Sequence, residues 1–169
     1  TDPQTTTTET PTGPQVITMR LRANPTAFSP YRTISSSSRY VYRNMFPALV
    51  TYEPNTTKLA PMLAKSLPVI EKITSGPYAG GESFTYEIHD NAVWDNGSPV
   101  LAADYIFTMK VINNPKIGGL TAAYRGILKF IKEVEVDSDN PRKFTVFTSR
   151  PYLDAISATG TWIYPEYAY

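Results

Sequence analysis

Residues 84–113 read FTYEIHDNAVWDNGSPVLAADYIFTMKVIN and contain three successive structural signals. Residues 84–88 alternate apolar and polar side chains, which predicts a strand with one buried face. The Asp-Asn-Gly sequence at 95–97 predicts a tight turn, because asparagine and glycine tolerate positive φ. Residues 102–113 carry apolar side chains at spacings of three and four, which predicts an amphipathic helix ended by Pro115. The stretch therefore predicts a strand, a turn and a helix.

Toward the C-terminus, the sequence predicts a strand pair and a short helix. Residues 130–136 and 143–148 have strand composition, and the turn sequence Asp-Asn-Pro lies between them. Residues 151–158 resemble a short helix. The carboxylates Glu133 and Glu135 alternate along the first strand, which indicates a solvent-facing side rather than an acid–base pair. We expect these two strands to form a pair, mainly antiparallel.

Toward the N-terminus, the signals are shorter. Residues 16–22 alternate in the manner of a strand, and residues 49–52 form a second, short strand signal. A helical pattern over 41–49 follows four serines that are good N-caps, and Pro47 predicts a kink in it. Pro61 predicts the start of another short helix, and the glycine-rich residues 74–81 a surface loop.

Strands and helices are mixed without a regular βαβ repeat. We therefore expect an α+β fold with a mixed, mainly antiparallel sheet and flanking helices. The chain has 169 residues, 41% of them hydrophobic, and a net charge of +1. This balance indicates a globular domain and gives no reason to expect a nucleic-acid partner.

The terminal segments and the residue types absent from the chain limit the choice of function. No cysteine is present, so disulfides and thiolate metal sites are excluded within the chain. No apolar run approaches the roughly 20 residues of a membrane helix. Residues 1–14, rich in threonine, predict either a disordered tether or a plain disordered terminus, and residues 15–169 the folded part.

The central stretch resembles the peptide/nickel-type family of bacterial solute-binding proteins that serve ABC importers (family 5). The residues that carry this resemblance are Trp94, Asp95, Gly97, Ser98, Pro99, Ala102 and Asp104. Three further landmarks occur in the family's order, at 28–30, 45–52 and 60–64. Leu101 departs from the family's Thr or Ser cap, so the helix would start differently or use Ser98. The likeness covers nearly the whole folded part of the chain but only the first third of a family member.

The resemblance implies part of the N-terminal lobe of a two-lobed, type II-like periplasmic binding protein, with the second lobe missing. It further implies capture of a solute by lobe closure, delivery to a membrane permease, and no catalysis. The implied protein is extracytoplasmic, periplasmic or at the cell surface, monomeric, and lipid-anchored upstream of residue 1. No cofactor or metal is expected. The solute stays open between a peptide, a nickel chelate and an oligosaccharide.

The resemblance also suggests two places for ligand contacts. The loop 31–37, with Ile34, Ser35, Ser36 and Ser37, would pair its backbone with an extended peptide. Ile34 stands where some peptide binders place an acidic residue, and the serines can equally be a helix N-cap cluster. Tyr124 can stack on a ligand or pack in the core.

Two other classes of function compete with this interpretation. The first is a self-contained adhesion or interaction module on a threonine-rich stalk, with exposed tyrosines as contacts. The second is a hydrolase that uses His89, the single histidine, with a serine and a carboxylate. No Gly-x-Ser-x-Gly elbow supports the second. We expect a binding protein.

Overall fold

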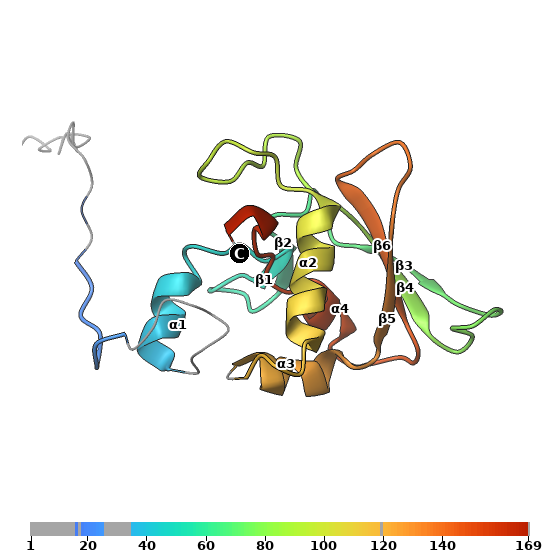
Figure 1. Cartoon of the computed structure of the whole chain (residues 1–169), viewed down its shortest axis with the longest axis horizontal. Coiled ribbons are helices and arrows are strands. Elements are labelled where there is room, and N and C mark those ends of the chain that lie inside the picture. The colour runs from blue at the N-terminus through green and yellow to red at the C-terminus, as the bar shows by residue number, and fades with distance from the viewer. Residues whose placement is uncertain (1–15, 17, 26–34, 119, 169) are drawn as a thin grey trace, which may run out of the picture.

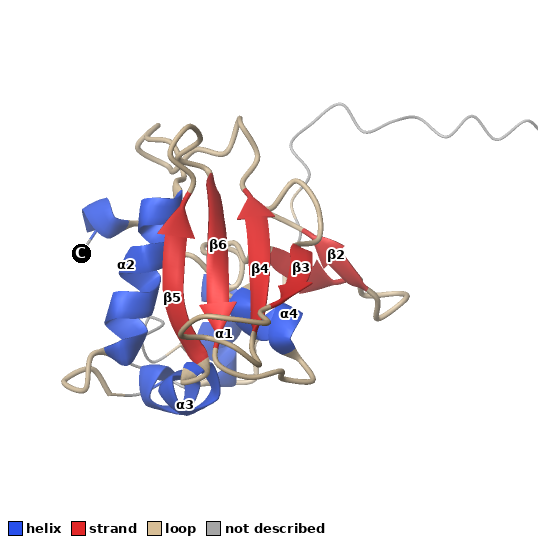
Figure 2. Cartoon of the chain, turned by 90° about the vertical axis from the view of Figure 1, so that its right-hand side faces the viewer, coloured by secondary structure: helices blue, strands red, loops and turns tan. Residues whose placement is uncertain are grey.

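A four-stranded antiparallel sheet is the centre of the computed structural model, which describes residues 16, 18–25, 35–118 and 120–168. The strand order is β3 (Val69–Lys72), β4 (Glu82–Glu87), β6 (Lys143–Thr148) and β5 (Ile131–Val136). Figure 2 shows these strands side by side, with β4 and β6 between the two edge strands. Register is set by pairs such as Tyr86 with Phe144.

The sheet buries one face against the long helix α2 (Ala102–Asn113). Side chains alternate along β4 and β6, so Tyr86 and Phe144 both point into the core and are about 1% exposed. The rings of Tyr105, on α2, and Phe144 lie 4.8 Å apart, and Tyr105 is completely buried. Burial of these large aromatic side chains is the main source of stability in this layer.

Smaller elements surround this layer (Figure 1). They are α1 (Ser36–Tyr42), the hairpin of β1 (Val50–Tyr52) and β2 (Leu59–Pro61), α3 (Leu120–Leu128), α4 (Ala155–Thr159) and the 3-10 helix η1 (Glu166–Ala168). The hairpin is antiparallel, and its connection includes Thr57 at a φ of 55°.

The C-terminal segment returns to the start of β1 and lies beside it. The backbone N–H of Leu49 donates to the carbonyl of Gly160 at 3.1 Å, and that of Ile163 donates to the carbonyl of Pro47 at 3.0 Å. An isolated antiparallel bridge pairs Ala48 with Trp162. Segments more than a hundred residues apart in sequence therefore form one surface.

The structure confirms the expected α+β class and most elements of the central stretch. The helix at 102–113 has the predicted bounds, and the strands at 84–88 and 143–148 form β4 and β6. Residues 74–81 form a loop between β3 and β4, and α4 overlaps the helix expected at 151–158 but starts later, at Ala155, and ends at Thr159. The N-terminus of α2 is capped neither by a hydroxyl at position 101 nor by Ser98. Instead, the Leu101 N–H donates to Asp104 Oδ2 at 3.0 Å.

Other expectations were wrong. The predicted helix over 41–49 lies earlier, as α1, and ends at Tyr42, because the chain must extend to pair residues 47–50 with 160–163. Pro61 ends a strand of the β1–β2 hairpin and starts no helix; its missing N–H is tolerated at a strand end. In the described part of 16–22 there is no strand, since no neighbouring strand pairs with it. The strand β3 and the helix α3 were not predicted.

Candidate functional site

An open groove lies where α1, β1, α3, α4 and the returning segment around Trp162 meet. Its two adjoining hollows measure about 320 and 200 Å³ and share part of their lining. We call it the aromatic groove and define it by six of its lining residues: Arg43, Tyr52, Tyr124, Asp154, Ser157 and Trp162. These residues come from distant parts of the sequence, so only the fold brings them together.

Trp162 organises the rings of the groove. Its indole meets Tyr42 edge to face, with ring centroids 5.6 Å apart, and meets Tyr124 in the same way at 6.0 Å. Tyr42 is completely buried, so it anchors the tryptophan on α1. Tyr124 and Trp162 are half-buried and keep part of their rings open to the groove. Such surfaces stack on flat or apolar ligand groups.

Positive charge lies next to the Tyr124 ring. Burial raises the pKa of the Tyr124 hydroxyl, and the nearby guanidinium groups of Arg39 and Arg43 act in the opposite direction. Arg39 lies in the last turn of α1, Arg43 is the C-cap residue that follows it, and both are exposed. Among the residues that the structure describes, neither forms an ion pair within 4 Å. Arg43, which lines the groove, therefore presents a cationic group to solvent at this end.

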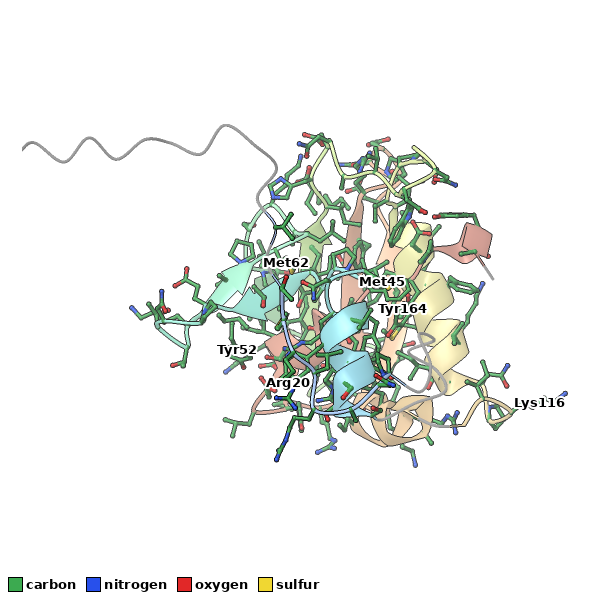
Figure 3. All side chains as sticks on the ribbon, turned by 90° about the vertical axis from the view of Figure 1, so that its left-hand side faces the viewer. Arg20, Met45, Tyr52, Met62, Lys116 and Tyr164 are labelled. Carbon is green, nitrogen blue, oxygen red and sulfur yellow. The ribbon has the colours of Figure 1, made fainter. Side chains whose placement is uncertain are left out.

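A small hydroxyl–carboxylate cluster forms the opposite wall. The Tyr52 hydroxyl donates to Asp154 Oδ1 at 3.1 Å and lies 2.8 Å from the Ser157 hydroxyl oxygen. Asp154 precedes α4 and Ser157 lies within it, so the cluster ties β1 to that helix. Figure 3 shows Tyr52 on the same side of the molecule as α1. The cluster supplies polar partners beside the aromatic rings.

The residues predicted from the sequence to contact a ligand do not all lie in the groove. Ile34 lies outside the described residues. Ser35 occupies the N-cap position of α1, where its side chain makes no capping hydrogen bond, and Ser36 and Ser37 lie in the first turn. None of these three serines lines the aromatic groove, and Ser37 is buried. Tyr124 does line the groove. A contact of any of these residues with a ligand stays a prediction.

Most of the groove has no signal in the sequence. Five of its residues belong to no motif: Arg43, Tyr52, Asp154, Ser157 and Trp162. The helix α3, which places Tyr124, has an amphipathic spacing of residues 120, 124 and 128 that signals a helix. This spacing is the sequence signal for one wall of the groove.

A separate hollow of about 630 Å³, apart from the aromatic groove, lies between η1 and the turn before α2. Its lining is mostly apolar and includes Phe46, Trp94 and Pro165. Tyr167 closes one side by donating its hydroxyl to Asp95 Oδ1. The side chains of Asp95 and Tyr167, which both line this hollow, are thus paired with each other.

The residues considered for catalysis are not assembled into a reactive site. His89 is exposed, and its backbone carbonyl accepts a hydrogen bond from Arg142 Nη1 at 2.9 Å. Its neighbour Asp90 binds Lys65 Nζ at 2.9 Å. Glu133 and Glu135 are exposed on β5, as predicted for a solvated face. Within the described ranges, no three His, Cys, Asp or Glu side chains gather in a way that could hold a metal ion.

No protein-family model matches the sequence, and no match to a curated protein was found. Solved structures do match. NikZ from Campylobacter jejuni, in complex with Ni(L-His), aligns at a TM-score of 0.65 and 23% identity, over 86% of this chain and 26% of its own. The oligopeptide-binding protein from Thermus thermophilus, complexed with a pentapeptide, aligns at 0.62 and 15%, over 82% and 23%. OppA from Burkholderia pseudomallei aligns at 0.62 and 18%, over 84% and 29%.

These matches confirm the fold that the sequence resemblance implied. The neighbours are two-lobed periplasmic binding proteins, and the chain has the fold of one part of such a protein. It spans about a quarter of the length of the solved chains it matches. None of the described helices has the length and apolar composition needed to span a bilayer.

Proposed function

We propose that this chain is the solute-contacting part of a binding protein of an ABC importer, which captures peptides or similar small solutes and performs no chemistry on them. The observation that carries the proposal is the aromatic groove, built on a fold shared with solute-binding proteins. NikZ binds Ni(L-His) and the Thermus protein binds a pentapeptide, so solutes with amino-acid character fit this fold.

The mechanism is binding between two walls. The groove is open and half-buried, which suits one wall of a site that a second lobe closes. The rings of Tyr124 and Trp162 supply apolar contact area for the solute. Delivery to a membrane permease then requires the protein to lie outside the cytoplasm, and a lipid anchor upstream of residue 1 would keep it at the membrane.

Isothermal titration of the full-length protein and of residues 1–169 against a peptide library tests this proposal. We expect the full-length protein to bind and the shorter chain to bind much more weakly, because one wall is missing. Trp162→Ala and Tyr124→Ala should each weaken binding by about tenfold or more, since buried aromatic contacts carry much of such affinities. Tyr40→Ala, on the exposed side of α1, is the control. Tight binding by residues 1–169 alone would contradict the two-wall mechanism.

A further inference from the structure

The turn at 95–97 carries a reactive sequence that the proposed binding function does not use. Asn96 is the one asparagine of the chain that glycine follows, and both residues are exposed. The Trp94 N–H donates to the Ser98 carbonyl at 2.8 Å, and the Gly97 N–H donates to the Trp94 carbonyl at 2.9 Å. Gly97 has a φ of 83°, which glycine adopts without strain. The turn therefore presents a side-chain amide next to a backbone nitrogen that no Cβ shields.

Ser98 holds the side chain of Asn96 in a bent conformation. Its backbone N–H donates to Asn96 Oδ1 at 2.9 Å, and its hydroxyl donates to the same oxygen at 2.7 Å. The first bond closes an Asx turn, a ring of atoms that includes the Gly97 nitrogen, so Asn96 Cγ is held near that nitrogen. When a nucleophile adds to Cγ, negative charge develops on Oδ1, and the two donors of Ser98 are placed to stabilise it. The turn thus combines an electrophile, a nucleophile and donors for the oxyanion.

Other asparagines lack one part of this arrangement. The backbone N–H two residues on donates to Oδ1 of Asn114 and of Asn140, in each case at 3.0 Å. Proline follows both residues, however, and its nitrogen has no proton to lose, so it cannot become a nucleophile. Asn55 is exposed in the connection of the β1–β2 hairpin, but the residue that follows it is a threonine, which is branched at Cβ. Of these four asparagines, Asn96 alone combines the Asx turn with a following N–H.

We propose that Asn96 is a site of spontaneous deamidation and that Ser98 promotes the reaction. The Gly97 nitrogen, once its proton has passed to hydroxide, attacks Asn96 Cγ, and the new C–N bond closes a cyclic imide. The bond from Cγ to the side-chain nitrogen breaks, and that nitrogen takes a proton from water and leaves as ammonia. Water then adds to either carbonyl of the imide and opens the ring, which leaves aspartate or isoaspartate at position 96. Each chain consumes one water molecule and releases one ammonia, and no enzyme takes part.

The modification should loosen the edge of the 630 Å³ hollow, which Trp94 lines. Asp95 Oδ1 accepts the Tyr167 hydroxyl, and the new carboxylate at position 96 follows Asp95 directly in the chain. Isoaspartate also adds one methylene to the backbone, within the loop that the hydrogen bond between Trp94 and Ser98 closes. Isoaspartate therefore disturbs the turn through both charge and length, whereas aspartate adds charge alone.

Peptide mapping by mass spectrometry tests the proposal on the full-length protein, incubated in mildly alkaline buffer. The peptide that contains Asn96 should gain one mass unit, and an isoaspartate-specific methyltransferase should label it. Peptides that contain Asn55, Asn114 and Asn140 should stay unchanged over the same time. Asn96→Gln, whose longer side chain would have to close a larger ring, should stay unmodified. Equally fast deamidation of the other asparagines, or the absence of isoaspartate at position 96, would overturn the proposal.

Ser98→Ala tests the promoting role, since it removes the hydroxyl and keeps the backbone N–H. Deamidation of this variant should be slower by about threefold to tenfold, the rate equivalent of a hydrogen bond worth about 0.7–1.4 kcal/mol. In concentrated urea, where the turn is lost, the variant and the wild type should react at the same rate. Ser138→Ala, at an exposed position between β5 and β6, is the matched control and should keep the wild-type rate. Equal rates for native Ser98→Ala and native wild type would overturn the role of Ser98.

Discussion

The indole Nε1 of Trp94 donates a hydrogen bond to Oδ2 of Asp104 across 3.1 Å, in the buried space between the turn at 95–97 and the first turn of α2. The same oxygen accepts the backbone N–H of Leu101, and Oδ1 accepts that of Glu166 at 3.2 Å. Asp104 is only 8% exposed. One carboxylate therefore joins the turn, the helix start and the C-terminal segment.

Replacement of this carboxylate should destabilise the fold. In Asp104→Asn only one side-chain oxygen remains to accept hydrogen bonds. The new amide NH₂ group then faces at least one of the N–H donors that the carboxylate binds. We expect a loss of about 2–3 kcal/mol in the free energy of unfolding, as for a buried hydrogen-bonded charge. Urea unfolding followed by tryptophan fluorescence measures it. Asp139→Asn, at an exposed position, should change the same quantity by less than about 0.5 kcal/mol. Equal stability of the two variants would contradict the capping role.

Two of the buried tyrosines, Tyr86 and Tyr105, predict a loss of stability at alkaline pH. Burial raises the pKa of Tyr86 and of Tyr105 above the ordinary value of 10.0. Their contribution is therefore fully present below about pH 10, where the unfolded chain also holds these protons. Above that pH it should fall by up to about 1.4 kcal/mol per pH unit for each phenol, since the unfolded state ionises first.

Unfolding free energies measured from pH 8 to 11 check this slope. Tyr105→Phe should be less stable at pH 8, because the hydroxyl donates to the Thr159 carbonyl at 2.7 Å. Above pH 10, however, its stability should decline less steeply than that of the wild type. Tyr40→Phe, which removes an exposed hydroxyl, is the control and should follow the wild-type curve. A parallel decline of Tyr105→Phe and wild type would refute the prediction.

Arg142 should hold the long connection between β4 and α2. Its Nη1 lies within 2.9–3.1 Å of the carbonyl oxygens of His89, Ala92 and Val100. Arg142→Met keeps much of the side-chain volume and removes all three contacts. We expect a loss of about 1–3 kcal/mol and faster hydrogen exchange at residues 89–100 than in β5 and β6. Arg150→Met, at an exposed position, is the comparison variant. Uniform exchange changes throughout the chain would argue against a local role.

Gly160 should be intolerant of a side chain. A Cβ at this position would lie 2.5 Å from Val50 Cγ2 and 2.8 Å from the carbonyl of Ile156. Gly160→Ala should therefore cost about 1–3 kcal/mol through overpacking and disturb the wall that carries Val50. Gly126→Ala provides the contrast, because no atom lies within 4 Å of its Cβ and the residue is in α3. It should stabilise the chain by about 0.5–1 kcal/mol. Thermal unfolding of both variants measures these changes in stability. An unchanged stability of Gly160→Ala would exclude close packing at this position.

Local patterns in the sequence determined the α+β class, the bounds of α2, the strands β4 and β6, and the turn before α2. Alternation and 3.6-residue spacing indicate which side chains one element buries, and residues 84–113 contain a clear example of each pattern. The same patterns gave wrong predictions at residues 16–22 and 59–64. A strand forms only where another strand pairs with it, and a local pattern does not show whether such a partner is present. Residues 59–61 become β2 because β1 pairs with them, and only the fold supplies that partner.

The tertiary structure alone decided the aromatic groove. Arg43, Tyr52, Tyr124 and Trp162 have no common motif, and they meet because residues 160–163 bond to residues 47–50. Contacts at such separations depend on the packing of the whole core around α2. A sequence periodicity describes one element at a time, so it cannot state which two elements will share a surface.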